Sequence, residues 1–291
     1  MGEQMQGKVV VITGATSGIG QVAAENLAGM GARIVQIARD RGRGEQAIRR
    51  LTSIHPGVEH TIHYADMSRM SEMKRVAAEI AQAEARIDVL INNAGALFRT
   101  RQLTEDGLEM TFALNHMAYF LLTDGLRERL VASAPARVVS TSSDAHRIAP
   151  LDLNDLQSEK AYRGSWFGSP GFKVYGRSKL CNILFTRELA RRLAGTGVTA
   201  NCLHPGFVAT RFGDQSGGFL SSLIGFAKRF AITPQKGAET ITYLASSPEV
   251  ENITGQYFYK CRVTQPNKNA QDDEMARRLW EETARLASIS N

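Results

Sequence analysis

Tyr175 and Lys179 are the residues whose types and spacing point most directly to chemistry, because they lie four positions apart in a segment with helical apolar spacing. Residues i and i+4 share one face of a helix, so the phenol and the ammonium group would be neighbours. A free phenol has a pKa of about 10, and an adjacent cation stabilises the phenolate and lowers this pKa. The pair could therefore exchange a proton with an alcohol or carbonyl oxygen. The same spacing also occurs in helices where both residues are only structural.

A glycine-rich turn offers a second kind of chemistry, the binding of phosphate. Gly14, Gly18 and Gly20 follow the β-branched run 8–13 and open a segment with helical spacing. Glycines let the backbone approach a pyrophosphate closely, and the free N–H groups at a helix N-terminus meet its charge. The turn therefore predicts a dinucleotide site, with a tight turn that binds nothing as the alternative.

The residues after the second predicted strand decide which dinucleotide is favoured. An acid about twenty residues beyond the glycines holds the 2′-hydroxyl of NAD, whereas a cation holds the 2′-phosphate of NADP. The sequence offers both Asp40 and Arg39, with Arg41 and Arg43 close by. Arg presents a fork of donors suited to phosphate, so we expect NADP(H) rather than NAD(H). The alternative is that Arg39 only pairs with Asp40 or another acid.

Strands and helices alternate along the chain. Alternation with mostly apolar strands predicts a doubly wound parallel (Rossmann) sheet of about seven strands with helices on both faces, in a single domain covering 1–291. The predicted strands are 8–13, 33–38, 59–64, 87–91, 137–142, 198–203 and 256–259, and the predicted helices are 19–27, 44–51, 71–84, 109–131, 174–193 and 234–245.

Two irregular segments and two serines complete the predicted site. Segments 148–172 and 207–231 are expected to be lids or substrate loops. Ser142 and Ser143 stand at the carboxyl end of a predicted strand, where open α/β sheets bind ligands. A hydroxyl there could hydrogen-bond the same oxygen as Tyr175.

Composition narrows the classes of protein. Apolar residues make up 43% and charged residues 22%, as in ordinary globular proteins. No apolar run approaches the roughly 18 residues of a transmembrane helix, and the start of the chain has no leader pattern. We therefore expect a soluble cytoplasmic protein without a transmembrane anchor. Cys181, Cys202 and Cys261 are widely spaced, which predicts free thiols rather than disulfides or a metal site.

The net charge of +6 is compatible with nucleic acid, an anionic surface or a phosphorylated ligand as partner. Its one concentration consists of Arg39, Arg41, Arg43, Arg49 and Arg50. This cluster lacks the interleaved aromatic residues of a single-strand binder, so no nucleic-acid partner is expected. The cluster is predicted to be either a solvated helix face or an anion site.

Taken together, the motifs resemble the short-chain dehydrogenase/reductase family over residues 7–260. In order, they are Thr13-Gly14-x-x-x-Gly18-x-Gly20, Asp66, Asn92-Asn93-Ala94-Gly95, Asn115, Ser142-Ser143, Tyr175-x-x-x-Lys179 and Pro205-Gly206-x-Val208-x-Thr210. The resemblance implies that Tyr175 is the general acid and base, Lys179 lowers its pKa and holds the nicotinamide ribose, Asn115 orders a relay water and Ser143 orients the substrate. It implies these cofactor contacts: Gly14, Thr16, Ser17, Gly18, Ile19, Gly20, Arg39, Asp66, Met67, Asn92, Ala94, Gly95, Tyr175, Lys179, Pro205, Gly206, Val208 and Thr210.

Within that family the chain is similar to the retinol dehydrogenase-like and WW-domain oxidoreductase-like branch. The likeness rests on 38–40, 143–146, 155–159, 178–182 and 203–206, and on the insert 151–172. It implies NADP(H) and an apolar carbonyl or alcohol substrate: a retinoid-like molecule, a lipid or a xenobiotic. It also implies a homodimer or homotetramer packed through the helices that carry Asn115 and Tyr175.

Several alternatives stay open. The chain could be a catalytically silent nucleotide-binding regulator or scaffold of the same fold, or a reductase of acyl-chain or steroid carbonyls. His146 and His204 are expected to be structural, because nothing pairs them with a nucleophile or a metal. Segment 219–230 is interpreted as a lid over an apolar substrate, with a membrane-surface helix as the alternative.

Overall fold

The β-branched runs of the sequence form one sheet in the computed structural model, which describes residues 4–148, 150–163, 170–206 and 232–288. The sheet has eight strands in the order β3-β2-β1-β4-β5-β6-β7-β8. They are β1 (Val9–Thr13), β2 (Arg33–Ala38), β3 (Thr61–Tyr64), β4 (Val89–Asn92), β5 (Ala136–Thr141), β6 (Val198–Leu203), β7 (Tyr257–Tyr259) and β8 (Arg262–Val263). The predicted doubly wound fold is confirmed.

All neighbouring strands of the sheet are parallel except β7 and β8. Val10 of β1 pairs with Ile34 of β2 and with Val89 of β4, so the strand order reverses at β1. Such a switch point places the carboxyl ends of β1 and β4 beside a ligand crevice. Only β8 is antiparallel; its two exposed residues were missed because so short a strand carries no alternation.

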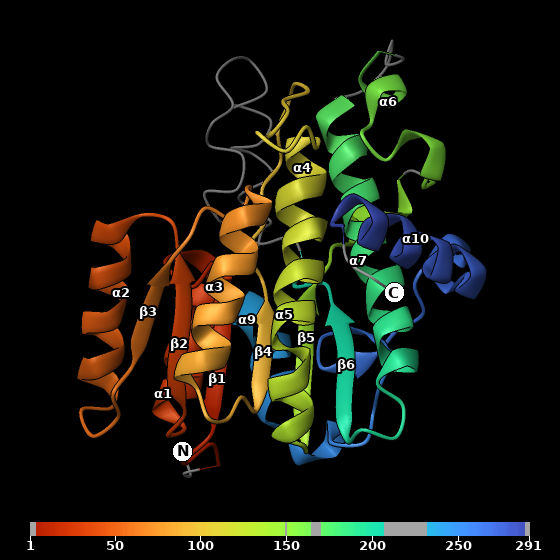
Figure 1. Ribbon diagram of the computed structural model, residues 1–291. Helices are drawn as coiled ribbons and strands as arrows, with labels where there is room; N and C mark the ends of the chain where they lie inside the picture. The colour runs from red at the N-terminus through yellow and green to blue at the C-terminus, as the bar shows by residue number, and fades with distance from the viewer. Residues whose placement is uncertain (1–3, 149, 164–169, 207–231, 289–291) are drawn as a thin grey trace.

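Helices cover both faces of the sheet (Figure 1). On one face, α1 (Gly18–Gly29), α2 (Arg41–Ile54) and α9 (Pro234–Ser246) bury their apolar residues. On the other face, in front of the sheet in Figure 1, lie α3 (Met70–Ala83), α5 (Ala118–Ala132) and α7 (Pro170–Arg192), with α10 (Asp273–Leu286) packed outside them. None of the helices in the described part of the chain is both long and apolar enough to cross a membrane.

Several predicted boundaries were wrong, each for a local reason. Helix α2 begins earlier than expected, at Arg41, because the Asp40 side chain caps it by accepting from the Arg43 backbone N–H. The predicted helix 109–131 is divided into α4 (Met110–Phe112), the π-helix η1 (Ala113–Met117) and α5. The apolar spacing of the sequence does not reveal this division, because a π-turn adds only one residue to the helical repeat.

The described part of segment 148–172, which leaves out 149 and 164–169, is less irregular than predicted. It contains the 3-10 turn η3 (Leu153–Asp155), helix α6 (Glu159–Arg163) and the first residues of α7. The buried Asp155 holds this segment by accepting from the backbone of Lys160 and Ala161 and from Arg177. Segment 207–231, the other predicted loop, lies outside the described residues.

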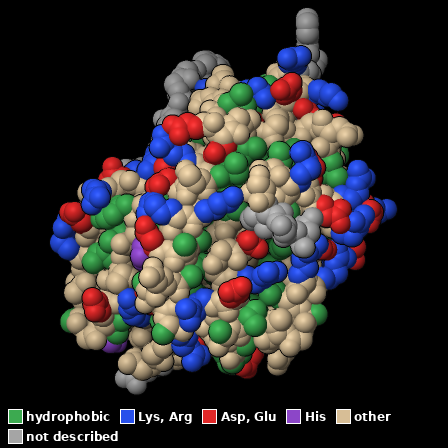
Figure 2. All heavy atoms as spheres, in the orientation of Figure 1, with side chains coloured by type: hydrophobic (Ala, Val, Ile, Leu, Met, Phe, Trp, Pro, Cys, Tyr) green, Lys and Arg blue, Asp and Glu red, His purple; other side chains and the backbone are tan. Residues whose placement is uncertain are grey.

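Helix α10 was not predicted. Its Trp280 ring stacks on Phe185 of α7 with centroids 5.7 Å apart and meets Phe120 of α5 edge-on at 4.8 Å. The Arg192 guanidinium lies over the same indole at 4.6 Å. The outer face of α10 is charged: Figure 2 shows blue and red side chains gathered on the right of the view, where α10 lies in Figure 1.

Candidate functional site

The glycine-rich turn packs against the loop that follows β4. Gly14 and Gly18 have φ angles of +70° and +60°, which residues with a Cβ rarely adopt. A Cβ at Gly14 would stand 2.9 Å from the Cα of Ala94, and one at Gly20 would overlap Asn93 Nδ2. Only glycine therefore allows this turn and this loop to approach each other.

The N-terminus of α1 has the properties of an anion site. Its N-cap Ser17 makes no side-chain cap hydrogen bond, and no acidic residue stands in the first turn. The first N–H groups of a helix lack intrahelical partners and favour negative charge. Thr16, Gly18 and Ile19 beside them are partly exposed, so this end of α1 is accessible. The donor set fits the pyrophosphate of a dinucleotide.

Asn93 and Thr13 connect the strand ends around this turn. Thr13 Oγ1 accepts from the backbone N–H groups of Asn93 and Ala94, each at 2.9 Å. Asn93 Nδ2 donates to Thr13 O at 3.1 Å, and its Oδ1 accepts from Thr141 Oγ1 at 3.3 Å. The ends of β1, β4 and β5 are thus held together. In the sequence, Asn93 stands out only as a member of the motif Asn92-Asn93-Ala94-Gly95, although its position directly after a strand was a usable signal for this bridging role.

Three further cofactor candidates differ in how they are placed. Asp66 follows β3, and its Oδ1 accepts from the backbone and hydroxyl of Ser68 at 3.0 and 2.7 Å. Met67 is buried beside it. Asn92 is fully buried, and its Nδ2 donates to Thr123 of α5 at 3.0 Å. The Asn92 side chain therefore bonds α5 in the interior, and its buried Oδ1 has no partner among the described residues.

Arg39 and Asp40, which follow directly after β2, differ in the contacts that their side chains make. Asp40 Oδ1 accepts from the Arg43 backbone N–H at 2.8 Å and lies 3.7 Å from Arg43 Nε. Arg41 lies over the Tyr64 ring at 4.7 Å. Arg39 is exposed and has no ion pair with any described residue. The alternative that Arg39 pairs with Asp40 is therefore not what the structure shows.

Tyr175 and Lys179 lie on one face of α7, both buried. Lys179 Nζ donates to Thr141 O at 2.9 Å and lies 5.7 Å from the centre of the Tyr175 ring. A Cβ at Gly95 would stand 3.3 Å from Lys179 Nζ and 3.1 Å from Asn115 Oδ1. The loop after β4 therefore approaches both α7 and the segment that carries Asn115.

Asn115 is fully buried in the π-helix η1. Its Oδ1 accepts from Ala96 N at 2.8 Å, and its Nδ2 donates to Ala96 O and Ser178 Oγ, both at 2.9 Å. The Ser178 hydroxyl in turn donates to Tyr175 O at 2.8 Å. Single π-turns are frequent at functional sites, and this one joins the loop after β4 to α7.

The two serines after β5 have different partners. Ser142 is buried, and its hydroxyl donates to Lys179 O at 2.7 Å. Ser143 Oγ accepts from Ala145 N at 3.2 Å and shares a side-chain hydrogen bond with Tyr175 that acts to lower the tyrosine pKa. The structure therefore brings Ser143, rather than Ser142, to the phenol.

Burial dominates the pKa values of the pair. It raises the pKa of Tyr175 to about 12, against the smaller lowering from the Ser143 hydrogen bond. It also lowers the pKa of Lys179 to about 7. The expectation that the cation lowers the tyrosine pKa below its usual value is thus wrong for this structure, because desolvation disfavours both charged forms.

The last predicted cofactor contacts fall partly outside the described residues. Pro205 and Gly206 follow β6, and Gly206 has a φ of +89°, where a Cβ would stand 2.9 Å from Ile232 Cδ1. Val208 and Thr210 belong to 207–231 and are not described.

The two predicted structural histidines both pack near strand ends. His204 Nδ1 accepts from Gly206 N at 3.3 Å, and its ring stacks on Tyr259 with centroids 4.1 Å apart. Burial lowers its pKa to about 4. His146 is fully buried against Tyr257.

Comparison with known proteins agrees with this geometry. The family model described as short chain dehydrogenase matches residues 8–151, and that described as Enoyl-(Acyl carrier protein) reductase matches 159–260. The human retinol dehydrogenase 14 is 42% identical over 95% of this chain and 85% of its own length. The human retinol dehydrogenase 12 is 40% identical over 98% of this chain and 88% of its own length.

Solved structures share the fold. An uncharacterized protein from Mycobacterium Paratuberculosis is 32% identical, with a TM-score of 0.75 over 98% of this chain and 95% of its own. The RhlG/NADP active-site complex of Pseudomonas aeruginosa is 25% identical, with a TM-score of 0.70 over 88% of this chain and 95% of its own. The chain therefore belongs to the short-chain dehydrogenase family, and within it is an oxidoreductase similar to the retinol dehydrogenases.

Proposed function

We propose that this protein interconverts an aldehyde or ketone and the corresponding alcohol with NADP(H), acting on an apolar substrate. The observation that carries the proposal is the hydrogen bond between Ser143 and Tyr175 at the carboxyl end of β5, with Lys179 on the same helix face. The glycine turn that fits a dinucleotide lies at the same edge of the sheet. The proposal takes 1–291 as one catalytic unit, because β1 to β8 form one sheet.

Tyr175 is the proton donor in the reductive direction. The nicotinamide supplies hydride to the carbonyl carbon when it is bound. The hydroxyls of Tyr175 and Ser143 hydrogen-bond the carbonyl oxygen, and the tyrosine proton passes to that oxygen as negative charge develops on it. A phenol with a pKa of about 12 is protonated at neutral pH, which suits a donor. In the oxidative direction the phenolate form of Tyr175 accepts the proton of the alcohol, which regenerates the phenol.

Lys179 and Asn115 support this proton transfer. A lysine with a pKa of about 7 can give up and recover a proton near neutrality, so it can restore the proton of Tyr175. Asn115 would order a relay water, and its segment joins the loop after β4 to Ser178 and α7. Asn115 also fixes the loop that contains Gly95 through its bonds to Ala96, and Lys179 lies beside that loop.

The contacts of Asp40 and the exposure of Arg39, directly after β2, support NADP(H) as the cofactor. The Asp40 carboxylate is used in capping α2, whereas Arg39 is exposed beside it. Arg39 could therefore grip a 2′-phosphate with two donors. One of the similar solved structures, the RhlG/NADP active-site complex, contains NADP.

The remaining proposed cofactor contacts lie along the same edge of the sheet. Asp66 and Met67 would face the adenine, Ala94 and Gly95 the ribose, and Pro205 and Gly206 the nicotinamide end. Asn92 would contribute through its backbone, because its side chain bonds Thr123.

Apolar residues near Tyr175 support an apolar substrate. Phe172 is 45% exposed and stacks on the Tyr175 ring, with centroids 6.3 Å apart. Ile148, also on this side of α7, is 50% exposed. Exposed apolar groups beside a site are suited to an apolar ligand, and the relatives named retinol dehydrogenase agree with this class.

Location and assembly form part of the proposal. Cys181, Cys202 and Cys261 are free thiols, which supports a reducing compartment such as the cytoplasm. A homodimer or homotetramer through the helices of Asn115 and Tyr175 would have to include α10, because α10 packs on α7 and contacts η1.

The test follows NADPH oxidation by absorbance with all-trans-retinal, medium-chain aldehydes, aromatic aldehydes and steroid ketones. Parent protein and Tyr175→Phe are compared, and NADPH binding is titrated by fluorescence. We expect turnover that disappears in the variant while NADPH binding remains. Tight NADPH binding without turnover on any substrate would contradict the proposal and favour a silent nucleotide-binding protein.

A further inference from the structure

The segment that follows β8 reaches the turn after Ser143 and the π-helix that carries Asn115, although it lies beyond the family matches, which end at residue 260. Residues 264–286 run from the end of β8 through α10. Asn267 in this segment contacts His146, three positions after Ser143. Thr283 contacts His116, the neighbour of Asn115. Each contact is made by a buried histidine.

His146 holds the turn that carries Ser143. Its Nε2 accepts from the Asn267 backbone N–H at 3.2 Å, so the neutral ring carries its proton on Nδ1. Nδ1 then donates to Ser143 O at 2.8 Å. Asn267 Nδ2 also donates to His146 O at 3.2 Å. The backbone of Ser143 is therefore fixed from the C-terminal segment through one imidazole.

His116 forms the corresponding link to Asn115. Its Nε2 lies 3.0 Å from Thr283 Oγ1 of α10, and its ring is 5.1 Å from Phe112 and 6.0 Å from Phe185. Burial lowers its pKa to about 3, so the ring is neutral at physiological pH. A neutral ring with one polar partner on α10 acts as a fixed spacer between α10 and η1.

The Asn182 side chain lies beside the His116 ring, since it acts to raise the pKa of that ring against the larger lowering by burial. In the described part of the chain, neither His116 Nδ1 nor Asn182 Oδ1 has a hydrogen-bond partner. Asn182 Nδ2 donates to Thr141 O at 3.2 Å, and the same carbonyl accepts from Lys179 Nζ at 2.9 Å. Thr283 of α10 therefore contacts the sequence neighbour of Asn115, and Asn182, beside the His116 ring, shares the Thr141 carbonyl with Lys179.

We propose that the C-terminal segment 264–286 positions Ser143 and Asn115 through hydrogen bonds to His146 and His116. These histidines and Thr283 are positioning residues, since each acts through another residue. The consequence for catalysis rests on the proposed reductase activity. The positioning itself is a property of the free protein and can be measured without turnover.

Thr283→Val tests the link to Asn115, because valine keeps the shape of threonine and removes the hydroxyl. We expect hydrogen exchange to become faster in the peptide 113–117 and to stay unchanged in the peptide of α1. In the active enzyme we expect kcat to fall about tenfold, because small misplacements in an active site are costly, with little change in KM. Thr283→Ser restores the hydroxyl and should recover both readouts.

His146→Asn and His146→Phe test the link to Ser143. The amide introduced by His146→Asn would stand where Nδ1 donates to Ser143 O, whereas phenylalanine keeps only the ring. We expect His146→Phe to lower kcat and speed exchange in the peptide 141–147, and His146→Asn to recover most of both.

Asp273→Asn is the control for a loss of stability without loss of these bonds, because within the described residues the Asp273 carboxylate pairs with Arg187 and Arg191 of α7 and with neither histidine. It should lower Tm and leave kcat unchanged. The proposal is overturned if exchange in 113–117 is the same in Thr283→Val and parent, or if kcat follows Tm alike in all variants. Absence of parent turnover would contradict the proposed function only, since the exchange data still decide the positioning.

Discussion

The glycine turn and the catalytic cluster, which consists of Asn115, Ser143, Tyr175 and Lys179, lie on either side of β4 at the carboxyl ends of the strands. They hold their functional groups by different means. On the glycine side, the groups offered to a ligand are backbone N–H groups of α1 and the exposed Arg39. Their placement depends on close backbone approach at Gly14 and Gly20. Few side-chain bonds are involved beyond those of Thr13 and Asn93.

On the catalytic side the functional groups are buried side chains. Tyr175, Lys179 and Asn115 are each 9% exposed or less. They are held by hydrogen bonds between segments distant in the chain, such as Lys179 Nζ to Thr141 O and Asn115 to Ala96. This difference teaches that changes on the glycine side should alter cofactor affinity, whereas changes on the catalytic side should alter kcat.

Tyr175→Phe should have the largest effect. It removes the proton donor and keeps the ring that stacks on Phe172, so we expect kcat to fall about a thousandfold with unchanged NADPH affinity. Tyr243→Phe, which removes a phenol hydroxyl on α9 that bonds Glu249, is the control and should leave kcat unchanged. Steady-state kinetics and a fluorescence titration measure the two quantities. An equal loss of affinity and rate would contradict the division between the two sides.

Arg39→Asp should act on affinity alone. The change replaces a donor to the 2′-phosphate by a repelling charge, so the NADPH Kd should rise about a hundredfold and the NADH Kd should change little. Arg49→Asp is the matched control, because Arg49 is an exposed arginine of the adjacent helix α2 that lies 4.0 Å from Glu45. Equal weakening of both cofactors by Arg39→Asp would show that Arg39 does not contact the 2′-phosphate.

Gly20→Ala tests the close approach on the glycine side. The added methyl would overlap Asn93 Nδ2 and Gly14 O, so the free energy of unfolding should fall by about 1–3 kcal/mol and NADPH should bind more weakly. Gly29→Ala, at the other end of α1, meets nothing closer than 3.7 Å and should not destabilise the protein. Urea unfolding of both variants provides the comparison. Equal stability of Gly20→Ala and parent would mean that the turn can move away from Asn93.

The two sides also differ in how far they could be predicted from the sequence. The turn around Gly14 and Gly20 and the end of β2 at Arg39 depend on residues close together in the chain, and the structure has the predicted strands and helix at these positions. The choice of Ser143 over Ser142 rested on family resemblance and stays a prediction; in the structure Ser143 is the serine that bonds Tyr175. Local patterns are enough where backbone conformation decides the site.

Long-range contacts were not predictable in the same way. The π-helix that carries Asn115 follows from no local pattern, and α10 was missed although it covers α5 and α7. The pKa of Tyr175 was predicted to fall and is raised instead, because its burial depends on packing among distant segments. Contacts of His116 with Thr283, 167 positions apart, lie beyond any sequence period.

The burial of Lys179 on the catalytic side should make the free energy of unfolding of the protein depend on pH. Burial lowers its pKa to about 7, whereas an unfolded chain has a lysine pKa of about 10.4. Between these values the unfolded chain binds the proton and the folded protein does not, so this lysine makes the free energy of unfolding rise with pH. The rise should be about 1.4 kcal/mol per pH unit between pH 8 and 9.

Lys179→Met should remove this rise, and Lys173→Met, at an exposed position of the same helix, should keep it. Urea unfolding at several pH values below 9 measures the slope while Tyr175, with its raised pKa, stays protonated. A parent protein with a flat profile in this range would show that Lys179 keeps its proton in the folded state.

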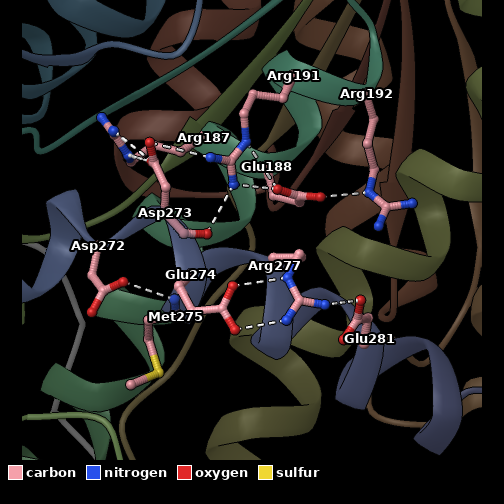
Figure 3. Close-up of polar contacts among 10 residues, drawn as sticks. All are labelled: Arg187, Glu188, Arg191, Arg192, Asp272, Asp273, Glu274, Met275, Arg277 and Glu281. Carbon is pink, nitrogen blue, oxygen red and sulfur yellow. Dashed lines mark hydrogen bonds and ion pairs between the residues drawn. The ribbon is translucent and has the colours of Figure 1, made fainter.

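We expect the smallest effect from the exposed ion pairs between α10 and α7. Figure 3 shows Asp273 of α10 between Arg187 and Arg191 of α7, at 2.7 and 3.2 Å. Asp273 is 54% exposed, so solvent screens these pairs and Asp273→Asn should cost about 0.5 kcal/mol of unfolding free energy. The loss should shrink in high salt, because salt screens exposed ion pairs. The total loss stays small because the stack of Trp280 on Phe185 holds α10 on α7. A larger loss that salt does not reduce would mean that the ion pairs, rather than the aromatic contacts, hold α10 on α7.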